Sequence, residues 1–369
     1  MVPIKFRLDK ESERIYIDKV LMCFKDGEKE RSSKEIGRFL NRLNGRLRRN
    51  LRRRASAFVS DYPTCYYLCM WIVLPYEQLQ KIKRYLDKVI KKDFVNINFC
   101  MKKYKREQIK SYHDLLLRRK KLSKKPYKEP AINKILGAKR IEYDDIYDDF
   151  ALFLEKYKKF IDKKFNQWII EITGFNVCPY CNIVYTYNRG ADVTAQLDHF
   201  FPKSEYPMFA VCFYNLIPSC PACNKLKLDG MEELASPYKY GAFEDLHIRW
   251  TFSGNADKST LGELEEMIKL EISSSDVSEE KNIEKMKLRQ AYERHRDYAG
   301  EMIKKVRIYS NKYTQEWISS IFDRGSGEKV IAPEEIERFY FSNYLQEEKF
   351  NKRPLSKMTK DIFKEYFDE

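Results

Sequence analysis

Two Cys-x-x-Cys pairs constrain the fold of this chain more than any other feature of its sequence. Cys178 and Cys181 form the first pair, Cys220 and Cys223 form the second, and proline follows the first cysteine of each pair. Because a Cys-x-x-Cys turn lets two thiolates reach one ion, two such pairs have the spacing of a tetrahedral zinc site. The sequence therefore predicts a structural Zn²⁺ that joins two segments separated by residues 182–219.

The remaining cysteines do not form a second pattern typical of a metal site or of a set of disulfides. The chain has nine cysteines, an odd number. Cys65 and Cys69 are one helical turn apart with no second pair nearby, so we interpret them as core thiols. Cys212 lies close to the zinc pairs and can compete as a ligand, but it has no partner at knuckle spacing. This usage is typical of metal thiolates in a reducing cytosol and argues against a disulfide scaffold.

Positive charge is concentrated in the first half of the chain. Residues 1–177 contain 43 Lys and Arg against 23 Asp and Glu, whereas residues 178–369 contain 27 against 32. Such an excess attracts polyanions, which are nucleic acids or acidic membrane surfaces. The best apolar run, 65–76, is too short to cross a bilayer, and the first ten residues lack the apolar core of a secretory signal. We therefore expect a cytoplasmic protein with no membrane partner.

Helical spacing of leucines predicts a basic amphipathic helix over residues 36–58. Arg46, Arg49 and Arg53 belong to an arginine stripe beside the leucines. This stripe either tracks phosphates or forms a solvated face over an ordinary core stripe, and the sequence leaves both interpretations open. Residues 102–128 are also dense in Lys and Arg, with interleaved tyrosines on which bases can stack.

Periodic apolar residues predict a mainly α-helical chain with a small embedded α+β unit. The longest such pattern predicts a helix over 143–173, ended by Gly174, that leads into the first cysteine pair. A strand is expected at 247–252. Further helices are expected near 288–306, 333–345 and 356–367.

Between the cysteine pairs lie residue types suited to phosphodiester hydrolysis with one divalent cation. That reaction needs a base for the attacking water, oxygen ligands for a hard cation and a group that orients the base. His199 can be the base, and Asp198 is a natural ligand for a hard metal. Because adjacent side chains on a strand face opposite sides, a strand end or bulge is expected at 197–200. Asn215 can hydrogen-bond the histidine, and zinc fixes Asn224 relative to Asp198.

The segment with these residues resembles the HNH nuclease family, in its variant with two Cys-x-x-Cys zinc clips. The resemblance implies a zinc-stapled ββα-metal core, with His199 as general base and Asn215 as the middle Asn. It also implies that Asp198 and Asn224 bind a catalytic Mg²⁺ or Mn²⁺. Many members have His at the last position, although some active members have Asn, as this chain does. Phosphate contacts are expected at three lysines, Lys203, Lys225 and Lys227.

The resemblance implies an HNH endonuclease. It also implies that DNA is favoured over RNA as the substrate. A further resemblance, to HNH proteins of bacterial anti-phage systems of the Septu type, implies a role in defence beside an ATPase partner, with a partner-binding seam at 288–306. Two alternatives stay open: a non-catalytic zinc-dependent nucleic-acid-binding module, and an RNA-directed toxin nuclease. The expected organisation is a basic, mostly helical nucleic-acid-binding or partner region (1–142), the nuclease core with its entry helix (143–240) and a mostly helical C-terminal region (241–369).

Overall fold

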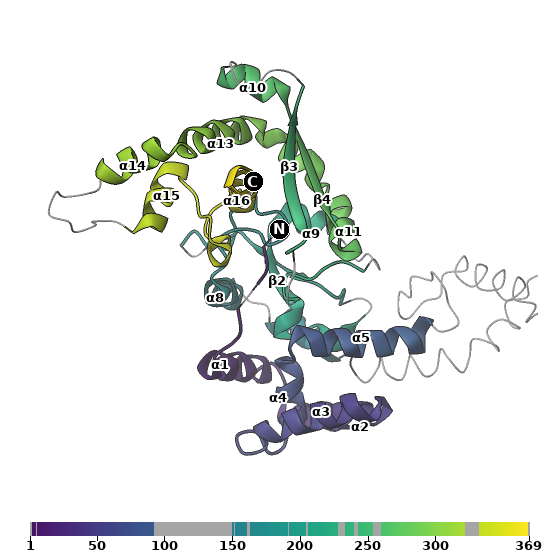
Figure 1. Cartoon of the computed structure of the whole chain (residues 1–369). Helices are drawn as coiled ribbons and strands as arrows, with labels where there is room; N and C mark the ends of the chain where they lie inside the picture. The colour runs from purple at the N-terminus through teal and green to yellow at the C-terminus, as the bar shows by residue number, and fades with distance from the viewer. Residues whose placement is uncertain are drawn as a thin grey trace, which may run out of the picture.

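Figure 1 traces the chain in a computed structural model that describes most of its residues. The described residues are 2–4, 6–91, 150, 152–160, 163–190, 192–203, 206–227, 233–239, 243–253, 260–321 and 332–367. The basic stretch 102–128 and the start of the helix expected over 143–173 lie outside them. The predicted base stacking and phosphate contacts in that stretch therefore stay predictions.

Helices form the N-terminal end of the molecule in its described residues (Figure 1). They are α1 (Lys10–Leu21), α2 (Asp26–Arg42), α3 (Gly45–Ala55), α4 (Tyr66–Ile72) and α5 (Tyr76–Lys91). The prediction of one helix over 36–58 is wrong. Leu43 adopts an extended conformation that ends α2, and the Asn44 side chain accepts a hydrogen bond from the backbone N–H of Leu47 at 2.9 Å, which starts α3. An asparagine in this position satisfies a free N–H of the first turn and so favours a new helix.

The helix that enters the first cysteine pair is confirmed over its described part. Residues 152–160 are helical, and so is α8 (Lys163–Thr173), which ends at the expected stop; residues 161 and 162 between them are outside the described residues. Gly174 has a φ of +64°, a left-handed conformation that glycine adopts without steric cost. Cys65 and Cys69 are buried with their sulfurs 3.9 Å apart, as expected for core thiols.

The centre of the molecule is a short hairpin followed by a helix. Strands β1 (Gln196–His199) and β2 (Leu216–Ser219) pair antiparallel, with Asp198 opposite Ile217. The intervening loop contains two 3₁₀ turns, η2 (Pro207–Phe209) and η3 (Phe213–Asn215), and α9 (Pro221–Lys227) follows β2 directly. The expected strand end is confirmed, since β1 stops at His199.

The C-terminal end combines a second hairpin with helices. The expected strand is β3 (Leu246–Phe252), which pairs antiparallel with β4 (Ile268–Ser274); both alternate buried and exposed residues, as strands with one buried face do. The helix expected over 288–306 is interrupted by a 3₁₀ turn, η4 (Glu293–His295). The helices of this end are α10 (Leu261–Met267), α11 (Val277–Lys285), α12 (Leu288–Tyr292), α13 (Arg296–Tyr309), α14 (Lys312–Ile321), α15 (Pro333–Phe341) and α16 (Ser356–Phe367).

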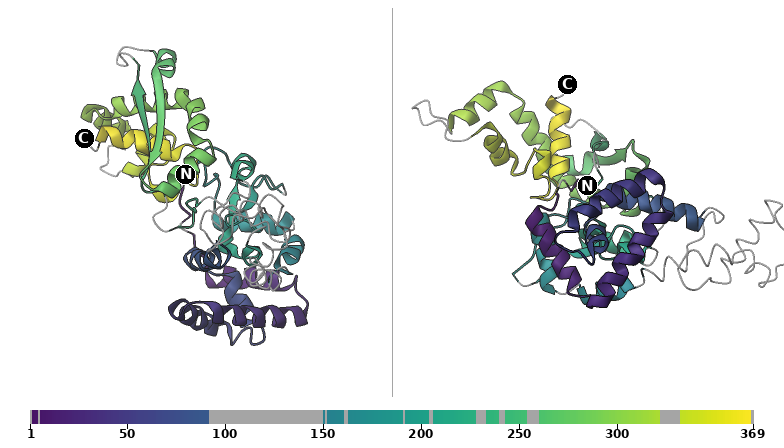
Figure 2. Two further views of the ribbon diagram at one scale, coloured as in Figure 1. Left: turned by 90° about the vertical axis from the view of Figure 1, so that its right-hand side faces the viewer. Right: turned by 90° about the horizontal axis from the view of Figure 1, so that it is seen from below.

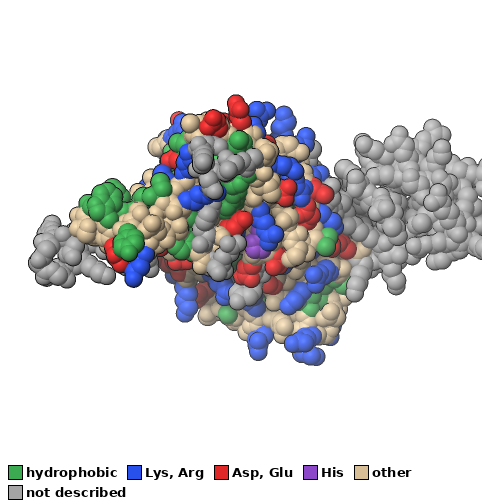
Figure 3. All heavy atoms as spheres, turned by 45° about the horizontal axis from the view of Figure 1, so that its top comes forward, with side chains coloured by type: hydrophobic (Ala, Val, Ile, Leu, Met, Phe, Trp, Pro, Cys, Tyr) green, Lys and Arg blue, Asp and Glu red, His purple; other side chains and the backbone are tan. Residues whose placement is uncertain are grey.

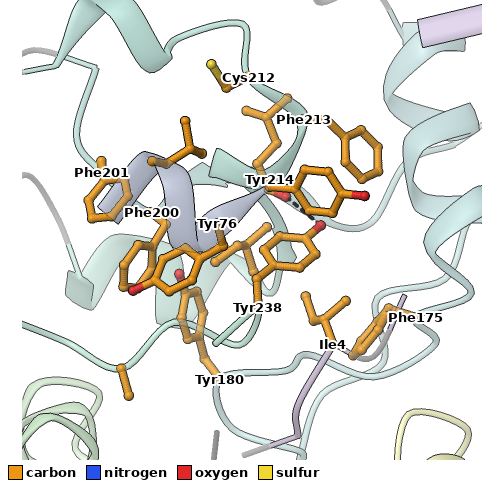
Figure 4. Close-up of a cluster of buried hydrophobic side chains, with 14 of the residues drawn as sticks. Ile4, Tyr76, Phe175, Tyr180, Phe200, Phe201, Cys212, Phe213, Tyr214 and Tyr238 are labelled. Carbon is orange, nitrogen blue, oxygen red and sulfur yellow. Dashed lines mark hydrogen bonds between the residues drawn. The ribbon is translucent and has the colours of Figure 1, made fainter. Parts of the chain in front are cut away.

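The two ends are joined through the central hairpin (Figure 2). Val2 donates its N–H to the carbonyl of Pro179 at 2.9 Å, and Ile4 donates to Pro237, so the first residues lie in the centre of the molecule. Aromatic side chains dominate the buried cluster around the hairpin (Figure 4). The described residues are thus mainly α-helical, as predicted, and they form two small two-stranded sheets, of which the β3–β4 pair was not predicted as a sheet. None of the described helices combines the length and apolar character that a bilayer-spanning segment requires.

The expected partner seam at 288–306 is wrong, because its apolar residues are internal. Leu288, Tyr292, Met302 and Val306 are each at most 1% exposed. They pack into the same buried cluster as the central hairpin. Among the large exposed apolar side chains, four are on the arm formed by α14 and α15 (green at the left of Figure 3), namely Tyr313, Trp317, Ile321 and Phe339.

Candidate functional site

The four cysteines of the two pairs form one buried cluster. Their Sγ atoms lie within 4.8 Å of one another, close enough to bind a single metal ion such as zinc. Burial raises the pKa of the Cys178 thiol well above its ordinary value, so a thiolate there requires a cation as partner. The Cys₄ cluster is therefore confirmed as a candidate metal site.

Local backbone geometry forms each pair into a metal-binding turn. Asn182 adopts a left-handed φ of 54° and donates its N–H to the carbonyl of Cys178 at 2.8 Å. Ile183 donates its N–H to Cys181 Sγ, and in the second pair Cys223 donates to Cys220 Sγ. These N–H groups point at sulfur, which stabilises negative charge on it.

Asp198 is buried on β1, and each of its carboxylate oxygens accepts one hydrogen bond. The Tyr180 hydroxyl donates to Oδ2 at 2.6 Å, and the Lys227 ammonium donates to Oδ1 at 3.1 Å. The same ammonium donates to the carbonyl of His199 at 2.7 Å. Burial and then the neighbouring carboxylate raise the pKa of Tyr180 well above its usual value, so the tyrosine retains the proton that it donates.

His199 is held at one ring nitrogen. Its Nε2 lies 3.0 Å from the carbonyl of Ala210, and because a carbonyl only accepts, Nε2 must bear the proton. Burial, followed by the nearby charge of Lys203, lowers the pKa of His199 to about 3, so the imidazole is neutral near pH 7. In a neutral imidazole with its proton on Nε2, the other nitrogen, Nδ1, is a proton acceptor.

Tyr157 links the surroundings of the two residues. Its ring contacts the His199 ring edge to face, with centroids 4.4 Å apart. Burial, and after it the charge of Asp198, raises the pKa of the Tyr157 hydroxyl. Lys203 lies over the same tyrosine ring, with its Nζ 5.2 Å from the centroid. Asp198, His199 and Lys203 therefore share one electrostatic neighbourhood.

Asn215 has a different role from the one expected. It does not hydrogen-bond His199; its Oδ1 accepts from the N–H of Phe201 at 2.7 Å, and its Nδ2 donates to the carbonyls of Phe201 and Phe209. These bonds fix the part of the loop that contains Ala210, whose carbonyl holds the His199 ring. The asparagine thus orients the histidine indirectly, through the loop backbone.

Asn224 lies against β1, as the zinc argument predicts. Its Nδ2 donates to Oε1 of Gln196 at 2.7 Å, which leaves the amide oxygen of Asn224 as an acceptor for a cation. Gln196 is two residues before Asp198, so both side chains lie on one face of the strand. Helix α9 therefore brings Asn224 to the strand face that presents Asp198.

The predicted phosphate contacts have different surroundings. Lys203 and Lys225 are exposed. The expectation for Lys227 is wrong for this structure, because its side chain is only 3% exposed and is paired with Asp198. Three exposed arginines, Arg46, Arg49 and Arg53, share one face of α3, but α3 lies at the far end of the molecule from α9 (Figure 1).

Sequence reasoning missed three contributors to this neighbourhood. Tyr180 lies inside the first cysteine pair, and no pattern in the sequence shows that its hydroxyl reaches Asp198. Tyr157 contacts His199 from a helix far away in sequence. Only Gln196 could have been found from the sequence, because residues two apart on a strand face the same side and Gln196 is two residues before Asp198.

Comparisons with known proteins give one limited likeness. No family model matches the chain, and no solved structure matches it. Protein ea31 of Escherichia phage lambda is similar to it, at 24% identity over 173 residues, which are 42% of this chain and 55% of that protein. The chain thus spans about half the length of the curated relative that it matches. The name of that protein states no activity.

Proposed function

We propose that this chain is a metal-dependent HNH endonuclease that hydrolyses phosphodiester bonds in nucleic acid, with DNA favoured as the substrate. The main support is one arrangement: a buried hairpin and helix, joined by the Cys₄ cluster, with Asp198 and His199 at the end of β1. The antiparallel β1–β2 pair followed directly by α9 has the order of a ββα unit.

Each residue of the proposed site has a role that its contacts support. His199 takes a proton from the attacking water at Nδ1, because its Nε2 is bonded to the Ala210 carbonyl. Asp198 and Asn224 would bind a Mg²⁺ or Mn²⁺ ion, since a carboxylate and an amide oxygen are ligands that such hard cations prefer. That ion, when bound, stabilises charge on the phosphate and the leaving oxygen. Zinc on the four cysteines has a structural role.

Substrate contacts in this proposal come from two places. Lys203 and Lys225 are exposed near the hairpin and helix, and the α3 arginines Arg46, Arg49 and Arg53 form a separate basic face. Phosphate contacts at both places would give a binding affinity that decreases with salt. A role in bacterial anti-phage defence beside an ATPase is proposed on the resemblance alone. Reconstituting cleavage with and without a co-purified ATPase tests it.

A cleavage assay with a matched histidine control tests the proposed activity. The purified chain is offered plasmid DNA, single-stranded RNA and tRNA side by side, with Mg²⁺ or Mn²⁺. We expect His199→Ala to lower the cleavage rate about 10²–10⁴-fold, the usual contribution of a general base. His247→Ala removes an exposed histidine on β3 and should cleave like the wild type. Unchanged cleavage in His199→Ala would sink the catalytic assignment.

The same assay separates the alternatives. A non-catalytic zinc module binds nucleic acid without Mg²⁺ and gives no product with any metal. An RNA-directed toxin nuclease cleaves tRNA or single-stranded RNA and leaves the plasmid intact.

A further inference from the structure

The two donors to Asp198 come from the two segments that carry the cysteine pairs. Tyr180 is the residue before Cys181, inside the first pair, and its hydroxyl is bonded to Oδ2. Lys227 ends α9, the helix that begins directly after Cys220 and contains Cys223, and its ammonium is bonded to Oδ1. A single carboxylate is thus held from both halves of the Cys₄ cluster.

Helix α9 is docked on β1 in a fixed register. Asn224 pairs with Gln196 at 2.7 Å, and Lys227 pairs with Asp198 at 3.1 Å. Three residues along a helix advance about 4.5 Å, and two residues along a strand advance about 6.7 Å, so the two pairs follow each other along both elements. A shift of the helix by one residue would break both pairs. The position of Lys227 relative to Asp198 is therefore fixed together with that of Asn224 relative to Gln196, on the helix that contains Cys223.

The two donors differ in charge. The hydroxyl of Tyr180 is neutral and fully buried, so it fixes the direction of the carboxylate without neutralising it. The ammonium of Lys227 neutralises a carboxylate that is only 6% exposed, which a buried charge requires. A divalent cation on Asp198 would neutralise it as well. The ammonium and the divalent cation are thus alternative counterions of one group.

We propose that Tyr180 and Lys227 are positioning residues for Asp198: Tyr180 sets the orientation of the carboxylate for the divalent cation, and Lys227 is its counterion in the metal-free protein. The two roles couple the Cys₄ cluster to the cation site, because Tyr180 lies inside the first cysteine pair and Lys227 lies on the helix that contains Cys223. This inference rests on the proposed function, since it assigns the divalent cation to Asp198. It adds two residues that act through Asp198 and do not themselves touch the reacting atoms.

Mn²⁺ binding, measured by electron paramagnetic resonance on the zinc-loaded protein, tests the role of Tyr180. We expect Tyr180→Phe to retain its zinc and to weaken Mn²⁺ binding about tenfold, the effect typical of removing a hydrogen bond to a metal ligand. Tyr292→Phe is the matched control. It removes an equally buried hydroxyl that is bonded to the carbonyl of Cys181 at 2.8 Å, and it should bind Mn²⁺ like the wild type.

Thermal unfolding with and without Mn²⁺ tests the role of Lys227. Lys227→Met leaves Asp198 without its counterion, so we expect the metal-free variant to unfold at a lower temperature than the wild type. Mn²⁺ should raise the unfolding temperature of this variant more than that of the wild type, because the ion replaces the lost ammonium. Lys227→Arg keeps the charge and should lie closer to the wild type in both conditions.

The outcomes separate this inference from the proposed function. Loss of Mn²⁺ binding in Asp198→Asn, with the two effects above, supports both. A different outcome overturns the positioning roles and leaves the nuclease proposal intact. In that outcome Mn²⁺ binding requires Asp198, but Tyr180→Phe binds Mn²⁺ as tightly as the wild type, and Mn²⁺ raises the unfolding temperature of Lys227→Met no more than that of the wild type. A wild-type protein that binds no Mn²⁺ overturns the nuclease proposal and these roles together. If Lys227→Met does not fold in either condition, the Mn²⁺ affinity of Tyr180→Phe decides.

Discussion

Asn215 illustrates how a single side chain organises the proposed site without touching its reactive groups. Fully buried, it makes three hydrogen bonds to the backbone of the loop between β1 and β2. That loop places the Ala210 carbonyl against His199. The side-chain amide of Asn215 therefore determines, through this loop, which nitrogen of His199 accepts a proton.

Asn215→Ala should cost about 3 kcal/mol of stability, because it leaves buried backbone groups without partners. It should also lower cleavage, since the loop no longer fixes the His199 ring. The control is Asn282→Ala, another buried asparagine, which bonds the N–H and carbonyl of Ala235 outside the site. Urea unfolding should show comparable losses in the two variants. Cleavage below the unfolding range should decrease only in Asn215→Ala, and equal cleavage would contradict the role of the loop.

At this scale the sequence predicts residue types better than contacts. Spacing and chemical type predict that the four cysteines meet and that Asn224 lies against the strand of Asp198, and the structure has both arrangements. The pairing of Lys227 with Asp198 could not be predicted, because a lysine near a phosphate-binding motif is ordinarily solvated. Its burial depends on how α9 docks on β1, which is a property of the folded molecule.

Among the elements, α3 shows how one capping residue changes an assignment. Apolar residues keep a helical spacing throughout 36–58, so this spacing alone predicts a single helix. Asn44 accepts a hydrogen bond from the N–H of Leu47, which is a helix-start signal within that period. The consequence is that α3 presents its arginines as a separate face, while Leu47 and Leu51 are buried on the opposite side.

Neutralising that face tests whether it binds nucleic acid. Arg46→Gln, Arg49→Gln and Arg53→Gln together should weaken binding and make log affinity less dependent on log salt, by about one unit of slope for each phosphate no longer neutralised. The Mn²⁺ affinity and zinc content should stay unchanged, because α3 is far from α9. Lys312→Gln on α14 serves as a control for removal of an exposed cation. Fluorescence anisotropy across a salt series measures the slope, and an unchanged slope would identify the stripe as a solvated face.

For the molecule as a whole, the Cys₄ cluster is a junction between segments that are distant in sequence. The Tyr292 hydroxyl donates to the carbonyl of Cys181, and Val2 donates to Pro179 within the same turn. Asn182 donates to the carbonyl of Phe350 at 3.0 Å. The predicted flanking regions, 1–142 and 241–369, thus both send hydrogen bonds into the central unit.

Metal removal should therefore affect the whole chain. Zinc sites of this type contribute apparent binding free energies of about 10–16 kcal/mol at pH 7. This is as large as the whole free energy of unfolding of a typical domain. We expect one zinc per chain, and Cys220→Ser should lose the metal and unfold at a much lower temperature. Cys212→Ala removes a buried thiol outside the cluster and should retain zinc. Elemental analysis with calorimetry measures both, and full zinc retention in Cys220→Ser would argue against the site.

The hydrogen bonds of Asn182 have a consequence for biosynthesis. Its side chain and backbone contact Phe350, Leu355 and Lys357, and all three of these residues are buried. During translation those residues emerge from the ribosome long after the first cysteine pair has emerged. The hydrogen bonds between that turn and these residues therefore cannot form until residues 350–357 have emerged, and the thiols of the turn stay more open to oxidation or to a wrong metal until then. Chaperone protection during that interval would matter more for this fold than for one whose metal turn closes on neighbouring residues.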